Sequence, residues 1–216
     1  MRDVQLFELD DHFQGGVSSG TIGGLPWIET SSAAGTNAMQ TAGVNHPGVI
    51  RLVTGAVSGN NKRLHVGASA SDATFTPANF DRFRWVVRIP TITTLTLRLG
   101  LMQDVSAVAG GAAGAFFSFD PAVSANWTFE TRQASVSTQG NAVAVVANNW
   151  YLLEAIRLVS GNWQFWINGT LRATHSATLP TTDCAFGVLC QTGAAAARNI
   201  DLDYCYCRSA FGQLFT

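Results

Sequence analysis

One β-hairpin can be identified directly in the sequence, at residues 163–172, and it constrains the fold more than any other segment. The segment reads Trp-Gln-Phe-Trp-Ile-Asn-Gly-Thr-Leu-Arg, with large apolar and polar residues preceding Asn168-Gly169. Asn-Gly best supplies the two positive φ angles of a two-residue hairpin turn, and a second strand resumes directly after it. The sequence therefore predicts an antiparallel strand pair that turns at Asn168 and Gly169.

A second strand with a period of two follows about thirty residues later. Residues 200–204 read Ile-Asp-Leu-Asp-Tyr. This alternation predicts one strand face with Ile200, Leu202 and Tyr204, and an opposite face with the two aspartates.

Strand signals recur along the whole chain between clusters of Gly, Asn, Ser and Pro, without an amphipathic helical run between them. This pattern predicts an all-β, antiparallel two-sheet sandwich. A length of 216 residues suits a single domain, residues 1–216, with residues 1–30 as an N-terminal arm or edge strand. The expected strands are 4–13, 27–30, 48–54, 62–67, 80–88, 94–102, 114–120, 127–133, 141–146, 150–159, 162–168, 170–176, 182–192 and 199–207.

Composition excludes several classes of partner. The net charge of −1 and the scattered basic residues argue against nucleic-acid binding. No run of about 18 to 20 apolar residues is available for a membrane span, and the acidic N-terminal segment does not resemble a secretory leader. We expect a chain made in a cytoplasm and not inserted in a membrane.

The low content of charge also predicts self-association. Charged residues make up only 12% of the chain, against 47% hydrophobic residues. Because surface charge normally keeps copies of a protein apart, we expect a closed homo-oligomer, with a trimer as the favoured state.

The cysteines favour buried thiols over a metal site. Cys184, Cys190, Cys205 and Cys207 lack the closely spaced knuckle of a structural zinc site, and the four histidines show no ligand spacing. No dense loop of oxygen ligands for calcium is present either. We expect no metal and no cofactor; a Cys184–Cys205 or Cys190–Cys207 bridge stays open as an alternative.

Aromatic residues offer the candidate sites, because sugar-binding modules stack sugar rings on exposed tryptophans. One set is expected to fill the core: Trp85, Trp150, Phe165 and Tyr204. Trp127 and Trp163 directly follow Asn126 and Asn162, so they are expected at surface or interface positions. The candidates for a carbohydrate or interface site are Trp127, Trp163, Trp166, Asn168 and His175.

The order of these motifs resembles the concanavalin A-like lectin/glucanase jelly roll. The resemblance is carried by residues 150–154, 163–169, 174–176, 179–180 and 200–204 and covers at least residues 80–208. Segments 9–13, 19–23 and 46–52 resemble the opening of bacteriophage structural proteins of this fold. The resemblance implies a two-sheet jelly roll and a place in a virion.

The chain lacks the catalytic strand of the jelly-roll glucanases. Those enzymes use a Glu-x-Asp-x-x-Glu strand that places two carboxylates on one face. Here Glu130 and Glu154 each stand alone in their strands. We therefore expect no catalytic residues.

These observations together predict a non-catalytic phage virion protein, made in the host cytoplasm. The favoured role is capsid decoration, with further copies of itself and the major capsid protein or tail proteins as partners. The alternative is a tail fibre or spike adhesin that binds host surface carbohydrate. A polysaccharide-degrading enzyme is the third hypothesis.

Overall fold

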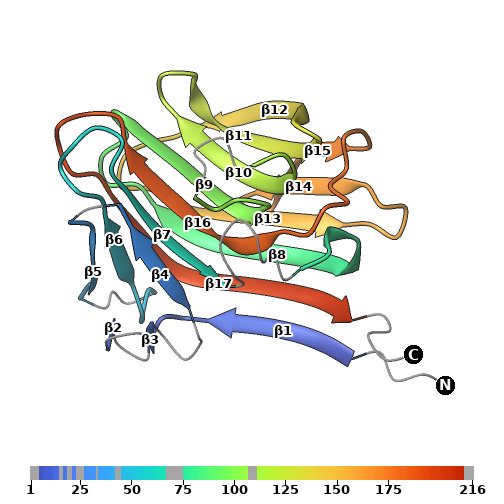
Figure 1. The fold of residues 1–216 in the computed structure, drawn as a ribbon, viewed down its shortest axis with the longest axis horizontal. Coiled ribbons are helices and arrows are strands. Elements are labelled where there is room, and N and C mark those ends of the chain that lie inside the picture. Colours follow the sequence, from blue (N-terminus) through green and yellow to red (C-terminus); the bar gives the residue numbers. More distant parts are fainter. Residues whose placement is uncertain are drawn as a thin grey trace.

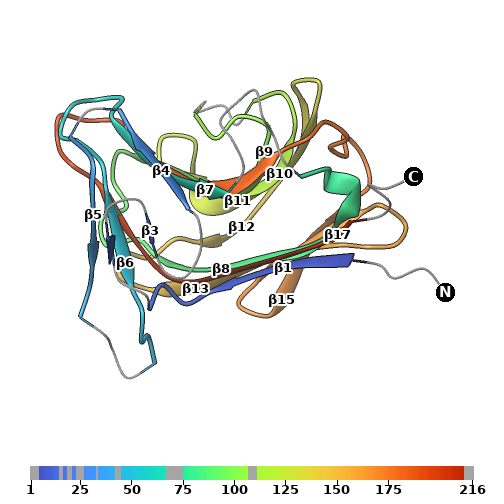
Figure 2. The ribbon, with the colours of Figure 1, turned by 60° about the horizontal axis from the view of Figure 1, so that its bottom comes forward.

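The computed structural model describes residues 5–14, 17–18, 21–22, 27–32, 34–41, 45–66, 75–106 and 111–211. Within these residues the chain forms two large antiparallel sheets that lie one on the other (Figures 1 and 2). The all-β two-sheet sandwich predicted from the sequence is thereby confirmed. No helix in the described ranges has the length and apolar character needed to cross a membrane.

The eight-stranded sheet contains the predicted hairpin at one edge and the longest strand near its centre. In spatial order its strands are β15 (Thr170–His175), β14 (Trp163–Ile167), β13 (Trp150–Arg157), β8 (Phe80–Arg88), β17 (Asn199–Phe211), β6 (Ile50–Val53) and β5 (Thr36–Met39), and β1 (Gln5–Asp11) also pairs with β17.

The seven-stranded sheet covers the other side of the core. Its order is β12 (Val136–Ala144), β11 (Ser124–Gln133), β10 (Gly114–Asp120), β9 (Leu95–Met102), β16 (Ala185–Thr192), β7 (Asn61–Val66) and β4 (Ile28–Ser31). Two short strands, β2 (Val17–Ser18) and β3 (Thr21–Ile22), pair with each other, and a 3-10 turn, η1 (Pro77–Asn79), precedes β8.

Aromatic side chains fill the space between the sheets. Trp85 of β8 stacks on Phe186 of β16 with ring centroids 4.9 Å apart, so the contact joins the two layers. Phe83 and Phe117 form an edge-on pair across the same interior. Because successive strand residues point to opposite faces, the polar residues between these apolar ones lie on the outer faces of the sandwich.

The hairpin predicted at residues 163–172 is confirmed. Ile167 pairs with Thr170, and the two turn residues have positive φ angles of 50° at Asn168 and 74° at Gly169. The Oδ1 atom of Asn168 accepts a hydrogen bond from the backbone N–H of Leu152 at 2.9 Å, which ties the turn to β13.

The alternation predicted for residues 200–204 is wrong in one respect. The pairing of β17 with β8 shifts by one residue between Leu202 and Tyr204, and a bulge at Asp203 accounts for the shift. The bulge reverses the facing of every later residue. Tyr204 therefore lies opposite Val86 on the outer face, and Cys205 takes the core position opposite Trp85.

All four cysteines are buried as free thiols, as the sequence predicts for their burial. Burial raises the pKa of the Cys184 thiol to about 12, so the thiol stays protonated and unreactive at neutral pH. Neither alternative disulfide bridge is formed.

Candidate functional site

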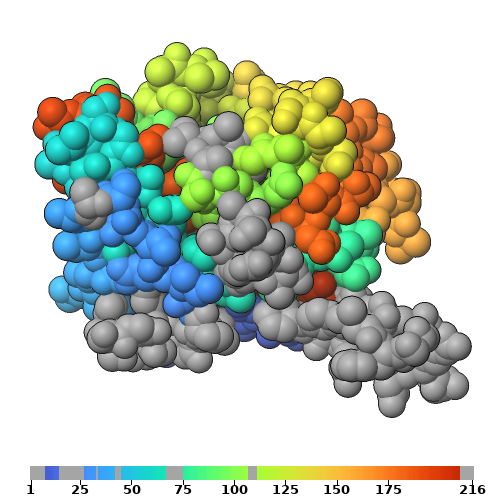
Figure 3. Space-filling model, viewed as in Figure 1, coloured from blue at the N-terminus to red at the C-terminus, as the bar shows by residue number. Residues whose placement is uncertain are grey.

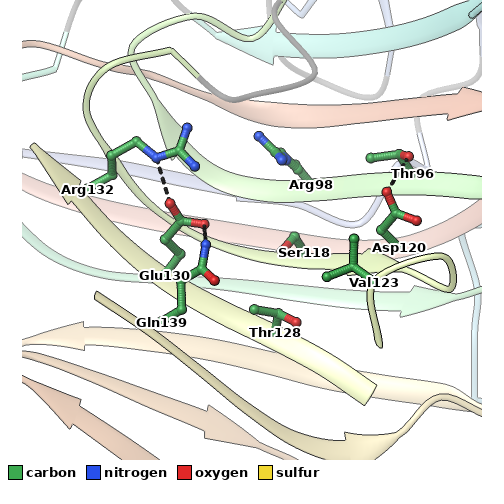
Figure 4. Close-up of a pocket in the computed structure, with 9 residues that line it drawn as sticks. All are labelled: Thr96, Arg98, Ser118, Asp120, Val123, Thr128, Glu130, Arg132 and Gln139. Carbon is green, nitrogen blue, oxygen red and sulfur yellow. Dashed lines mark hydrogen bonds and ion pairs between the residues drawn. The ribbon is translucent and has the colours of Figure 1, made fainter. Parts of the chain in front are cut away.

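A polar pocket opens on the outer face of the seven-stranded sheet, across β9 to β12 (Figure 4). It has a volume of about 150 Å³. Alternate residues of four adjacent strands line it, together with one residue of the β10–β11 turn: Thr96, Arg98, Ser118, Asp120, Val123, Thr128, Glu130, Arg132 and Gln139.

Strand register brings these side chains together. Ser118 of β10 lies opposite both Arg98 of β9 and Thr128 of β11, so the three form one row across the sheet. In the next row, Glu130 pairs with Gln139 of the edge strand β12. The site is therefore built on strands rather than on loops, which holds its groups in fixed positions.

An apolar cluster lies beside the pocket on the same outer face. Phe116, Met102 and Ala185 are buried there against Val105, from the segment that follows β9. The guanidinium carbons of Arg98 and Arg132 lie 5.2 Å and 5.8 Å from the centre of the Phe116 ring. An aromatic surface thus supports both cations.

The two carboxylates of the pocket have protein partners on both oxygens. Glu130 is buried and accepts hydrogen bonds from Arg132 Nε at 2.6 Å and from Gln139 Nε2 at 2.9 Å. Asp120 accepts from Thr96 Oγ1 at 3.1 Å and from the backbone N–H of Ala122 at 2.9 Å. Both carboxylates are thereby held as structural hydrogen-bond acceptors.

Arg98 is the exception in this network. Its Nε and Nη1 atoms are buried and have no hydrogen-bond partner in the described part of the chain. Burial lowers the pKa of Arg98 to about 10; the charge of Glu130 opposes this shift and that of Arg132 adds to it. Figure 4 shows the guanidinium groups of Arg98 and Arg132 pointing toward each other across the pocket.

The structure does not bring the predicted site residues together. Trp127 and Trp163 are fully buried in the core, and His175 is buried against Phe129 and Phe165, so the expectation that these three lie at the surface is wrong. Each occupies an inward position of its strand, which the flanking polar residues did not reveal.

The other two candidates lie on the eight-stranded sheet, away from the pocket. Trp166 is half-buried and faces outward on β14, and Asn168 is exposed in the hairpin turn. Their role in a binding site stays a prediction.

Of the four aromatic residues expected in the core, two lie outside it. Trp85 and Phe165 are fully buried, as predicted, whereas Trp150 and Tyr204 are half-buried on the outer face of the eight-stranded sheet. Trp150 stacks on His46 with ring centroids 4.2 Å apart, and Tyr204 packs against His12 at 4.7 Å.

That outer face carries a network of charges. Asp201 is fully buried and accepts hydrogen bonds from both Arg51 and Arg88 at 2.6–2.9 Å, while His46 pairs with Asp203 at 2.9 Å. Both carboxylate oxygens of Asp201 are thus hydrogen-bonded to arginines. Among the described residues, no three metal-ligating side chains converge.

Charged residues at outward strand positions are the sequence signal for the pocket. The sequence-based prediction of the site rests on aromatic residues instead. Arg98 stands at an outward position between Leu97 and Leu99, and Glu130 and Arg132 share the outward face of one strand. Only the register of β9, β10 and β11 shows that these isolated charges meet.

The two antiparallel sheets give the chain the fold of a concanavalin A-like jelly-roll sandwich. Comparison with protein families matches residues 45–203 to the family described as SO2946-like, C-terminal domain. The chain belongs to this family. A search of curated proteins finds no match.

Solved structures share the fold at low sequence identity. The protein of unknown function SO2946 from Shewanella oneidensis MR-1 has a TM-score of 0.67 at 14% identity, over 99% of this chain and 91% of that one. The Bacillus licheniformis β-glucanase has a TM-score of 0.60 at 10% identity, over 93% and 97%. The carbohydrate recognition domain of Emp47p has a TM-score of 0.58 at 9% identity, over 94% of each chain.

Proposed function

We propose that this protein is a non-catalytic glycan-binding module and that the pocket on the seven-stranded sheet is its binding site. The observation that carries the proposal is the set of groups that four strands place around one hollow: guanidinium donors, carboxylate and amide oxygens, and hydroxyls. Sugars present many hydroxyl donors and acceptors, which such a set matches. The likeness in fold to a carbohydrate recognition domain supports the same class of ligand.

The pocket does not suit glycoside hydrolysis. That reaction needs one carboxyl group to donate a proton and a second to act as nucleophile or base. Both oxygens of Glu130 and both of Asp120 already accept hydrogen bonds from neighbouring groups. Neither carboxylate can therefore take the role of proton donor or nucleophile without giving up one of these hydrogen bonds.

A glycan array tests this proposal with a variant that fills the pocket. Ser118→Phe places a ring in the middle of the lining without changing its charge. Thr174→Phe is the matched control, since Thr174 is exposed on the eight-stranded sheet. We expect the wild type and the control to bind the same glycans and Ser118→Phe to lose that binding by at least about tenfold. Equal binding by Ser118→Phe, at an unchanged melting temperature, contradicts the proposed site.

As a second candidate function, we propose that the chain is a virion protein that decorates the capsid. A tail adhesin is the alternative virion role, and it is compatible with glycan binding. In this proposal the chain is made in the host cytoplasm and assembles with copies of itself and with capsid or tail proteins. One observation favours assembly: β12 ends the seven-stranded sheet, and its nine residues include no charged side chain. Sheet edges of monomeric proteins are usually protected by charge, proline or a covering segment.

Light scattering tests the assembly proposal. We expect a trimer at tens of micromolar, with a mass about three times the 23.0 kDa of one chain. A lysine introduced at the exposed residue Asn141, in the centre of the β12 edge, should weaken the association. A mass of 23.0 kDa at that concentration contradicts self-association.

A further inference from the structure

The pocket contains two guanidinium groups that differ in their hydrogen-bond partners. Arg132 is neutralised by Glu130, at 2.6 Å, and also donates from Nη1 to the carbonyl oxygen of Gly111 at 3.1 Å. Arg98 lies over the same Phe116 ring, yet its Nε and Nη1 atoms have no acceptor among the described residues. The Arg98 guanidinium therefore has hydrogen-bond donors in the pocket that no described residue accepts from.

The available carboxylates do not supply the missing acceptor. Asp120 is bonded to Thr96 and to the backbone of Ala122, and Glu130 to Arg132 and Gln139. A buried donor without an acceptor is costly, and so is a pair of like charges directed at each other. An anion bound between the two arginines would relieve both costs.

We propose that the pocket recognises the carboxylate of an acidic sugar, of the hexuronic acid class, with Arg98 as the residue that selects it. This inference rests on the proposed glycan-binding function and names its ligand class. The unpaired Nη1 of Arg98 and the neighbouring Nη2 can donate to the two carboxylate oxygens in parallel, the end-on planar arrangement that arginine forms with carboxylates.

The other groups of the pocket suit the remainder of such a sugar. Ser118 and Thr128 place hydroxyls in the row next to Arg98, and Gln139 offers an amide at the β12 edge. The volume of about 150 Å³ is below the roughly 300 Å³ at which drug-sized pockets begin. The site therefore holds a single sugar unit of a longer chain, with its neighbours outside the pocket.

Calorimetric titration with matched pairs of oligosaccharides tests this proposal. The probes are oligogalacturonate, oligomannuronate, oligoguluronate and hyaluronan fragments, each beside its carboxyl-reduced counterpart, and one sulfated, uronate-free oligosaccharide. We expect at least one uronate to bind at least about tenfold more tightly than its reduced counterpart. We expect Arg98→Gln to remove that preference, and Arg98→Lys, which retains the charge without the planar fork, to retain part of it. Arg172→Gln is the control, because Arg172 is exposed on β15.

The outcomes separate this inference from the proposed function. Equal binding of a uronate and its reduced counterpart overturns the carboxylate assignment and leaves glycan binding intact. Preferred binding of the sulfated probe also overturns the assignment, since charge alone would then be recognised. Binding of no probe, acidic or neutral, overturns both. If Arg98→Gln does not fold, the comparison of paired probes on the wild type and Arg98→Lys still decides the question.

Discussion

The charge network around Asp201 gives the sharpest test of what holds the eight-stranded sheet together. The Asp201 side chain is fully buried and receives four hydrogen bonds from Arg51 of β6 and Arg88 of β8. Asp201→Asn keeps the shape of the side chain but leaves both guanidinium groups facing a neutral amide. Breaking a buried ion pair by removal of one partner costs about 3–5 kcal/mol. Because each arginine side chain is 29% exposed and can regain some water, we expect about 3 kcal/mol, the lower end of that range.

Thermal unfolding followed by circular dichroism measures this cost. For a chain of this length, about 1 kcal/mol corresponds to roughly 2–4 °C, so Asp201→Asn should lower the melting temperature by about 6–12 °C. Asp81→Asn is the matched control, since Asp81 pairs with Arg208 at 3.0 Å on the surface, where both side chains are about 40% exposed. Such a surface pair contributes about 0–1 kcal/mol. Equal shifts for the two variants would refute the assignment of Asp201 as a buried structural anion.

Three further predictions concern the hairpin, the buried imidazole and the absence of turnover. Gly169→Val should lower the free energy of unfolding by at least about 1 kcal/mol, because valine is strained at a φ of 74°, and an unchanged denaturation midpoint contradicts this. Burial lowers the pKa of His175, so its contribution to stability should be complete above about pH 6.5 and fall at lower pH, by at most about 1.4 kcal/mol per pH unit. Urea unfolding of the wild type and His175→Gln between pH 4.5 and 8 checks this; parallel curves would exclude it. Incubation with β-glucans, alginate and bacterial capsular polysaccharide should release no reducing ends or unsaturated products, whereas turnover abolished by replacing Glu130 or Glu154 would establish an enzyme.

Local chemistry in the sequence predicts much of this fold. Two expected strands, residues 80–88 and 114–120, match β8 and β10 at both ends, and the Asn-Gly turn lies where its φ preference requires. The sequence does not predict strand β5, because Thr36–Met39 is short and half of its residues are polar. It predicts a start for β12 five residues too late, because the first half of that strand is uncharged and only weakly apolar. Such edge strands bury little, so their sequences show weak alternation.

The candidate site was the part that sequence reasoning failed to predict. A flanking asparagine suggested surface positions for Trp127 and Trp163, yet the direction of a side chain depends on strand phase, and both point inward. One bulge at Asp203 was enough to move Tyr204 to the outer face. The pocket around Arg98 depends on the register of four strands, a long-range property that no local pattern contains.

A crystal structure with a bound oligosaccharide tests the central claim most directly. We predict that the sugar lies in the pocket on the seven-stranded sheet, with a ligand oxygen within about 3 Å of Nη1 or Nη2 of Arg98. A sugar stacked instead on Trp150 or Trp166, on the outer face of the eight-stranded sheet, would contradict the assignment of the site.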